Sequence, residues 1–179
     1  IFEENYKKSY LISQPLFEEI YREVNSGNEI RSVILHGERE IGEIGNSPLW
    51  KVGKRFNDNN EIETYQNTIV SKTAGMYLGA MMAQIDILIK EGHCYSEIVN
   101  ESVIEATDSL NPYMYEKGIS HMIDNCSVTA RLGARKWASR LDYLYEQNMD
   151  SIDIADYDFN QFKNHPIHDV IEELYQYKN

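Results

Sequence analysis

The sequence predicts an all-α fold, and three observations support that class. Apolar residues recur every three or four positions along most of the 179 residues, as expected for amphipathic helices. The alternation typical of strands is nearly absent, because the one short β-branched run, "SVILHG", lies within a better helical pattern. No internal repeat of fixed period is present. The length suits one domain and allows a sizeable core.

The first helical pattern covers residues 13–27. Ser13 is a candidate N-cap, Pro15 falls in the first turn, and Gly27 is a candidate end. A second short helix is expected over 28–40. The polar stretch 53–66 has no apolar period and is predicted to be a surface loop.

The longest helical pattern is "TIVSKTAGMYLGAMMAQIDILIKEG", which Gly92 ends. Gly75, Gly79 and Ala83 form a stripe of small residues along it. Such a stripe allows a second backbone to approach closely, so we expect tight core packing there rather than a catalytic role.

An acidic helix follows, in which Glu97, Glu101 and Glu105 are each four residues apart. Residues at this spacing share one helical face, and like charges there cost a few tenths of a kcal/mol per pair. Ser96 is a candidate N-cap and Pro112 a candidate stop. The other face is apolar and predicted to be buried: Ile98, Val99, Val103, Ala106 and Leu110. The acidic face is either simply solvated or a cation site.

The remaining chain predicts further helices. The pattern over 116–148 is consistent with two helices joined near Gly133, and a last helix is expected over 165–177. His165 and His168 are three residues apart and could share a metal, but they flank a proline at a helix start. A capping or surface role is therefore the preferred interpretation of both histidines.

Composition excludes several classes of function. The net charge of −12 argues against binding to a phosphate backbone, and no apolar run is long enough to span a membrane. Two cysteines, Cys94 and Cys126, are too few for a disulfide framework and favour a reducing compartment. The first residues are charged, resemble no signal peptide and do not include methionine, so we expect a fragment or a processed product.

Familiar catalytic motifs are also missing. The chain has no GxGxxG after a strand, no phosphate-binding GxxxxGK[ST] loop and no GxSxG elbow. Cys126 and Ser127 could suggest covalent catalysis, but no histidine and carboxylate arrangement accompanies them. The Glu-x-x-His pairs of di-iron bundles are absent too. Carboxylates remain, because a hard ion such as Mg²⁺ prefers oxygen ligands.

Three segments follow one another in the chain: "NEIRSVILHG", "LWKVGKR" and the long "MMAQIDILIKEGHCYSEIVNESVIEATDSLNPYMYEKGISHMIDNCSVTARLGARKWASR". In this order they resemble the C-terminal helical domain of plant-type ketol-acid reductoisomerase, and the likeness is densest from Thr73 to Tyr143. It covers nearly the whole chain and thins after Gln147. It implies that residues 1–179 are part of an all-α domain of a type known for a deep backbone knot. A chain without the upstream helices need not keep that threading.

The resemblance also implies an activity and its cofactors. This family converts 2-acetolactate or 2-aceto-2-hydroxybutyrate to 2,3-dihydroxy acids, by a Mg²⁺-dependent alkyl migration followed by reduction with NADPH. By position in the motif, Glu101 and Glu105 of "ESVIE" resemble the pair serving one of two Mg²⁺ ions, with Glu105 also suited to proton transfer. Ser127 of "DNCS" resembles the serine that binds the substrate carboxylate, and Cys126 and Leu110 resemble its pocket neighbours.

Other features of the family have no counterpart here. The DxxxE helix that supplies the remaining metal ligands is not found, nor is the N-terminal Rossmann domain that binds NADPH. We therefore expect the isolated chain to be inactive and the intact enzyme to be a homo-oligomer. Likeness to plant enzymes implies a plastid, with the cytoplasm as the alternative. A non-enzymatic acidic interaction module is the competing hypothesis.

Overall fold

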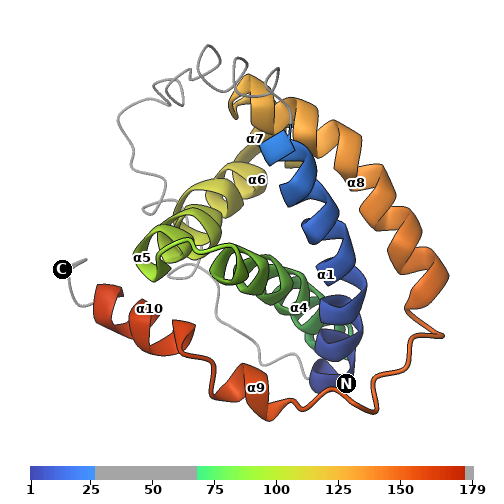
Figure 1. Cartoon of the computed structure of the whole chain (residues 1–179). Coiled ribbons are helices and arrows are strands. Elements are labelled where there is room, and N and C mark those ends of the chain that lie inside the picture. Colours follow the sequence, from blue (N-terminus) through green and yellow to red (C-terminus); the bar gives the residue numbers. More distant parts are fainter. Residues whose placement is uncertain (27–67, 176–179) are drawn as a thin grey trace, which may run out of the picture. The chain divides into compact units, whose positions relative to one another are not determined.

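The structure, a computed structural model, describes residues 1–26 and 68–175 (Figure 1). Helices dominate this part of the chain and no strand occurs in it, so the predicted all-α class is confirmed. The predicted helix over 28–40 and the predicted loop over 53–66 lie outside the described residues. The helical elements are α1 (Phe2–Ser26), α4 (Thr68–Lys90), α5 (Tyr95–Ile98), η1 (Val99–Ile104), η2 (Ala106–Leu110), α6 (Asn111–Lys117), α7 (Ile119–Asp124), α8 (Val128–Asn148), α9 (Asn160–Lys163) and α10 (Ile167–Tyr175).

The described residues divide into two compact units. The first contains residues 1–19, 68–104 and 143–175, and the second contains residues 20–26 and 105–142. The division passes through α1, through α8 and between η1 and η2.

Close packing of α1 on α4 organises the first unit. A Cβ atom added to Gly79 would lie 2.4 Å from the carbonyl oxygen of Tyr6, and one added to Gly75 would lie 2.5 Å from that of Phe2. The Ser9 hydroxyl donates to the carbonyl of Met76 across the same contact, at 2.5 Å. The predicted close approach of a second backbone to this stripe is therefore confirmed.

The predicted start of the first helix was wrong. The helix begins at Phe2 and runs to Ser26, so Ser13 and Pro15 lie inside it. Ser13 is buried and its hydroxyl bonds to that of Tyr145 at 2.9 Å, a partner remote in sequence. Pro15 is exposed, where the backbone carbonyl that lacks a helical donor can reach water.

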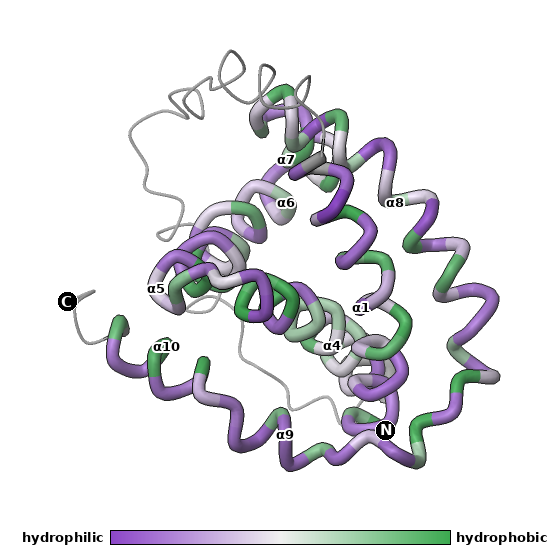
Figure 2. Tube along the Cα trace, viewed as in Figure 1, coloured by the Kyte–Doolittle hydropathy of each residue, from purple (hydrophilic) through white to green (hydrophobic). Residues whose placement is uncertain are grey.

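The core of the first unit lies along α4. Figure 2 shows that α4 carries more hydrophobic colour than α1 or α8. The predicted end of this helix is confirmed, because α4 stops at Lys90 and Gly92 adopts a φ of 90°. The buried apolar cluster consists of Tyr6, Tyr10, Met82, Ala83, Ile85, Ile98, Val99 and Ile167.

The second unit contains η2, α6, α7 and most of α8. Gly118 separates α6 from α7 with a φ of 91°, which favours glycine. The chain turns again at residues 125–127, and α8 then continues through Gly133 without a break. The predicted joint near Gly133 was therefore wrong, because a single glycine in a helix costs only about 1 kcal/mol and does not end it.

The helix bearing the acidic residues also differs from its predicted ends. Cys94, not Ser96, is the residue before its first turn. Pro112 does not stop the helix; it lies where η2 passes into α6, and helical backbone continues beyond it. Helical backbone therefore extends from Tyr95 to Lys117, interrupted only by changes of helix type.

Candidate metal and substrate site

Glu101 lies in η1, a π-helical segment of the first unit. Its side chain is exposed and its Oε1 accepts a hydrogen bond from the Asn100 amide at 3.0 Å. The residues around it are held in the core: Val99 is 0% exposed and Ser102 is 6% exposed. The Ser102 hydroxyl accepts a hydrogen bond from the Gln84 amide of α4 at 3.1 Å. An anchored backbone thus presents a carboxylate to solvent.

The acidic pair Glu101 and Glu105 lies where two π-helical segments, η1 and η2, follow each other in the chain. Glu101 belongs to η1, and Glu105 is the residue immediately before η2, with α-helical φ and ψ of −61° and −43°. Consecutive π segments are rare in proteins, and π-bulges occur frequently at functional sites. No pattern in the sequence indicates them, because a π turn depends on the surroundings of the helix rather than on the local residues.

Glu105 and Cys126 both belong to the second unit, and the charge of one acts on the other. Burial raises the pKa of the Cys126 thiol, and the negative charge of Glu105 raises it further, while Arg131 opposes both effects. The thiol donates a hydrogen bond to the Met122 carbonyl at 3.2 Å. Cys126 is therefore held protonated at neutral pH, which argues against a nucleophilic role.

Ser127 follows directly and is the residue before α8. Its Oγ accepts a hydrogen bond from the backbone N–H of Ala130 at 3.2 Å, the bond of a helix N-cap. The hydroxyl can still donate its own proton, since a hydroxyl is both donor and acceptor. Ser127 is partly exposed, so that proton can reach a ligand.

Leu110 lies in the same unit as Glu105, Cys126 and Ser127. It is half-buried at the end of η2, and α6 begins directly after it. The turn that carries Cys126 is fixed from within, because the Asn125 side chain donates to the carbonyl of His121 at 2.7 Å. Four of the five predicted site residues thus belong to one compact unit, and Glu101 belongs to the other.

The carboxylates suit a magnesium ion only as part of a larger ligand set. Among the described residues, no group of three or more histidine, cysteine, aspartate or glutamate side chains lies close enough to hold a metal. Glu101 and Glu105 offer the hard oxygen donors that Mg²⁺ prefers, but its octahedral shell needs further ligands. Their chemistry therefore fits a partial site.

The neighbouring acidic residues have other partners. Glu97 is exposed and its Oε2 lies 3.4 Å from His93 Nδ1. The Asp108 carboxylate accepts a hydrogen bond from the Thr107 hydroxyl at 3.2 Å. Each of these two carboxylates therefore has a polar partner close to it in the sequence.

Among the described residues, His165 and His168 belong to no group of three or more side chains that could hold a metal ion. The Nδ1 of His165 accepts the backbone N–H of Ile167 at 3.1 Å, which confirms the predicted capping role. His165 also contacts Asp86, and sequence reasoning missed this pair. Its one signal was a single carboxylate inside an otherwise apolar stretch, "AQIDILI".

Comparison with known proteins identifies the family. A family model described as ketol-acid reductoisomerase, C-terminal domain, matches residues 71–176, more than half of the chain. The chain belongs to the ketol-acid reductoisomerase family. The matched range contains Glu101, Glu105, Leu110, Cys126 and Ser127.

Named ketol-acid reductoisomerases are similar over most or part of the chain. The chloroplastic protein of Spinacia oleracea is 44% identical over 185 residues, covering 95% of this chain and 31% of that protein. The chloroplastic protein of Pisum sativum is 42% identical over 186 residues, with 96% and 32% covered. The mitochondrial protein of Saccharomyces cerevisiae is 49% identical over 59 residues, with 33% and 15% covered.

This chain spans about a third of the length of the two chloroplastic ketol-acid reductoisomerases. No solved structure matched it. Within residues 1–26 and 68–175, none of the helices combines the length and apolar character needed to cross a bilayer.

Proposed function

We propose that this chain supplies part of the magnesium and substrate site of a ketol-acid reductoisomerase. In this proposal the complete enzyme converts 2-acetolactate or 2-aceto-2-hydroxybutyrate to the 2,3-dihydroxy acid, with Mg²⁺ and NADPH, in branched-chain amino acid synthesis. The observation that carries the proposal is the family match over residues 71–176, which includes both segments "ESVIE" and "DNCS". The chain corresponds to the C-terminal helical domain, and NADPH binds to a Rossmann domain elsewhere in the protein.

Glu101 and Glu105 are assigned to the metal. A Mg²⁺ ion supplies Lewis-acid chemistry that polarises a ketone oxygen and stabilises negative charge as it shifts. The exposed carboxylate of Glu101 anchors the ion, and the half-buried carboxylate of Glu105 does so from a less solvated position. Because Glu105 is near the substrate residues, it also holds or moves a proton at the reacting oxygen.

Ser127, Cys126 and Leu110 are assigned to the substrate. The Ser127 hydroxyl donates to the substrate carboxylate, while its oxygen keeps the N-cap bond to Ala130. Cys126, as a protonated and half-buried thiol, and Leu110 supply a mainly apolar wall. Such a wall suits the small alkyl groups of an acetohydroxy acid.

Assembly and compartment follow from the same reasoning. Large apolar side chains of the second unit are exposed, with Leu132 at 58%, Ile119 at 61% and Tyr115 at 60%. Exposed apolar side chains of this size are typical of surfaces that another chain or domain covers. We assign them to the contacts of a homo-oligomer. The two chloroplastic relatives support a plastid location for this enzyme.

The test is a magnesium titration by calorimetry on the full-length protein that contains this chain. Glu101→Gln and Glu105→Gln each remove one anionic donor with little change of shape, and we expect each to weaken Mg²⁺ binding by about tenfold or more. Glu97→Gln is the matched control, because Glu97 is an exposed carboxylate one turn earlier. Equal Mg²⁺ affinity in all three variants would reject the assignment and favour the acidic interaction module.

A further inference from the structure

We propose that Asp86 and His165 are positioning residues for the carboxylate of Glu101. The pair joins α4 to the start of α10, and α10 packs on the segment that carries Glu101. This inference rests on the proposed role of Glu101 as a magnesium ligand. All the residues that carry it belong to the first unit.

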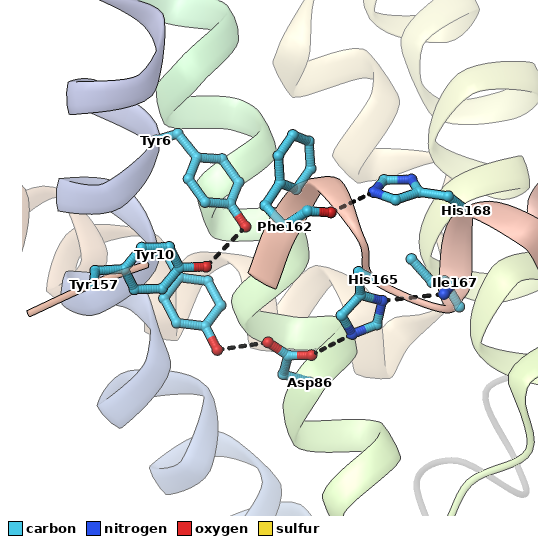
Figure 3. Close-up of polar contacts among 8 residues, drawn as sticks. All are labelled: Tyr6, Tyr10, Asp86, Tyr157, Phe162, His165, Ile167 and His168. Carbon is cyan, nitrogen blue, oxygen red and sulfur yellow. Dashed lines mark hydrogen bonds and ion pairs between the residues drawn. The ribbon is translucent and has the colours of Figure 1, made fainter. Parts of the chain in front are cut away.

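Asp86 connects three separate segments of the chain. Its Oδ2 accepts a hydrogen bond from the Tyr10 hydroxyl of α1 at 2.5 Å, and its Oδ1 accepts one from His165 Nε2 at 2.9 Å. Figure 3 shows the carboxylate lying between the tyrosine and the imidazole. Hydrogen bonds to a carboxylate are about twice as strong as neutral ones, so this bridge resists displacement more than apolar contacts do.

The hydrogen bonds of His165 fix the position of its proton. Because its Nδ1 accepts the backbone N–H of Ile167 at 3.1 Å, the ring proton lies on Nε2 and points to Asp86. Ile167 is the first residue of α10. The same ring therefore binds α4 through one nitrogen and satisfies a first-turn N–H of α10 through the other, which sets where α10 begins.

Helix α10 in turn supports the helix that carries Glu101. Ile167 is 0% exposed and shares the core cluster with Ile98 and Val99. Further apolar residues of α10 pack against this cluster: Val170, Ile171 and Leu174. Val99 is two residues before Glu101, so a shift of α10 displaces the backbone from which Glu101 projects.

A second hydrogen bond from α4 holds the residue that follows Glu101 in the sequence. Gln84, two residues before Asp86, donates to Ser102 at 3.1 Å. Apolar contacts are not directional and would allow α10 to slide, whereas hydrogen bonds fix distance and angle. The α4 bonds therefore fix η1 and the start of α10 relative to α4, and Glu101 projects from η1 with its side chain exposed.

The experiment compares Mg²⁺ affinity and backbone protection in the full-length protein. His165→Phe keeps an aromatic ring and removes both hydrogen bonds, and His165→Gln restores one donor and one acceptor. His168→Phe is the matched control: its Nε2 donates to the Phe162 carbonyl at 2.7 Å, a bond that stays within the α9–α10 region. Mg²⁺ binding is measured by calorimetry without substrate, and hydrogen exchange is measured on peptides covering residues 95–104.

We expect His165→Phe to weaken Mg²⁺ binding by about three- to thirtyfold, the range for residues that act on a site through packing. We expect faster exchange over residues 95–104 in the same variant, and partial recovery of both readouts in His165→Gln. His168→Phe should lower thermal stability while leaving Mg²⁺ affinity and exchange in that segment unchanged. If His165→Phe does not fold, Tyr10→Phe removes only the other bond to Asp86 and should act in the same direction.

Three results would overturn the inference. If Glu101→Gln weakens Mg²⁺ binding but the His165 and Tyr10 variants do not, Asp86 and His165 only stabilise the fold and the metal role of Glu101 stands. If Glu101→Gln has no effect on Mg²⁺ binding, the proposed function of Glu101 itself fails. Equal losses in His165→Phe and His168→Phe would also reject a specific role for the Asp86 bond.

Discussion

Replacing Gly79 by alanine tests the closest backbone contact in the first unit. The new Cβ would lie 2.4 Å from the Tyr6 carbonyl oxygen, 2.8 Å from Ser9 Cβ and 2.9 Å from the Tyr10 nitrogen. Two of these atoms belong to the backbone of α1, so no side-chain rotation can remove the clash. Normal van der Waals separation requires α1 and α4 to move apart locally by about 1 Å.

The expected cost follows from two opposing terms. Overpacking a well-packed core costs about 1–3 kcal/mol, and rigid backbone neighbours place Gly79→Ala near the upper end. Alanine favours a helix over glycine by about 1 kcal/mol, which offsets part of this cost. We therefore expect the free energy of unfolding to fall by about 2 kcal/mol. The melting temperature should fall by about 4–8 °C for a chain of this size.

The assay is thermal and urea unfolding followed by circular dichroism, with Gly133→Ala as control. Gly133 also lies inside a helix, but a Cβ added there meets nothing within 4 Å. That variant should gain up to about 1 kcal/mol from helix propensity alone. If Gly79→Ala is as stable as Gly133→Ala, α1 does not lie against α4 as described and the packing argument is wrong.

Three further predictions concern titration and the substrate residues. Burial raises the pKa of Tyr6 and Tyr10 above the ordinary value of 10.0. The hydroxyl groups therefore lose their protons at lower pH in the unfolded chain than in the folded one. Above pH 10 the free energy of unfolding should fall by about 1.4 kcal/mol per pH unit for each tyrosine. Urea unfolding at a series of pH values measures this slope, which Tyr10→Phe should reduce. Glu105→Gln removes a charge that raises the pKa of Cys126, so iodoacetamide should alkylate Cys126 faster in this variant. Peptide mass spectrometry measures the rate, and an unchanged rate would contradict the interaction between Glu105 and Cys126. Ser127→Ala should lower the free energy of unfolding by about 1 kcal/mol, because the N-cap is lost. Ser127→Asp keeps the cap and should raise KM by repelling the substrate carboxylate. An unchanged KM in Ser127→Asp would show that Ser127 caps the helix without binding the substrate.

The sequence allowed correct prediction of α4 because its signals are local. Gly92 adopts the positive φ that ends a helix, and the small residues at Gly75 and Gly79 can serve only for close approach or flexibility. By contrast, Ser13 and Pro15 are typical of a helix start but lie inside α1. The Ser13 hydroxyl is used by Tyr145, which is 132 residues away, and no local pattern can reveal such a partner.

The candidate site residues came from the family resemblance, and their grouping could not be predicted from the helical pattern. The family resemblance supplied Glu105, Cys126 and Ser127, and the structure places all three in one compact unit. The bridge from Tyr10 through Asp86 to His165 was not predictable, because it joins residues 76 and 79 positions apart. Hydrogen bonds of this kind depend on tertiary packing, which the helical period does not encode.

The acidic face first presents a physical problem, because like charges at four-residue spacing repel one another. In the structure each carboxylate interacts with a different residue: Glu97 lies by His93, Glu101 accepts a hydrogen bond from Asn100, and the charge of Glu105 raises the pKa of Cys126. Glu97 and Glu101 are exposed and keep most of their solvation, so their repulsion is weak. Glu105 is half-buried, and its charge raises the pKa of the Cys126 thiol, so a cation bound at Glu105 would lower that pKa. This difference in exposure within one row of carboxylates supports the proposal that Glu101 anchors the ion from the solvent side and that Glu105 combines anchoring with proton transfer.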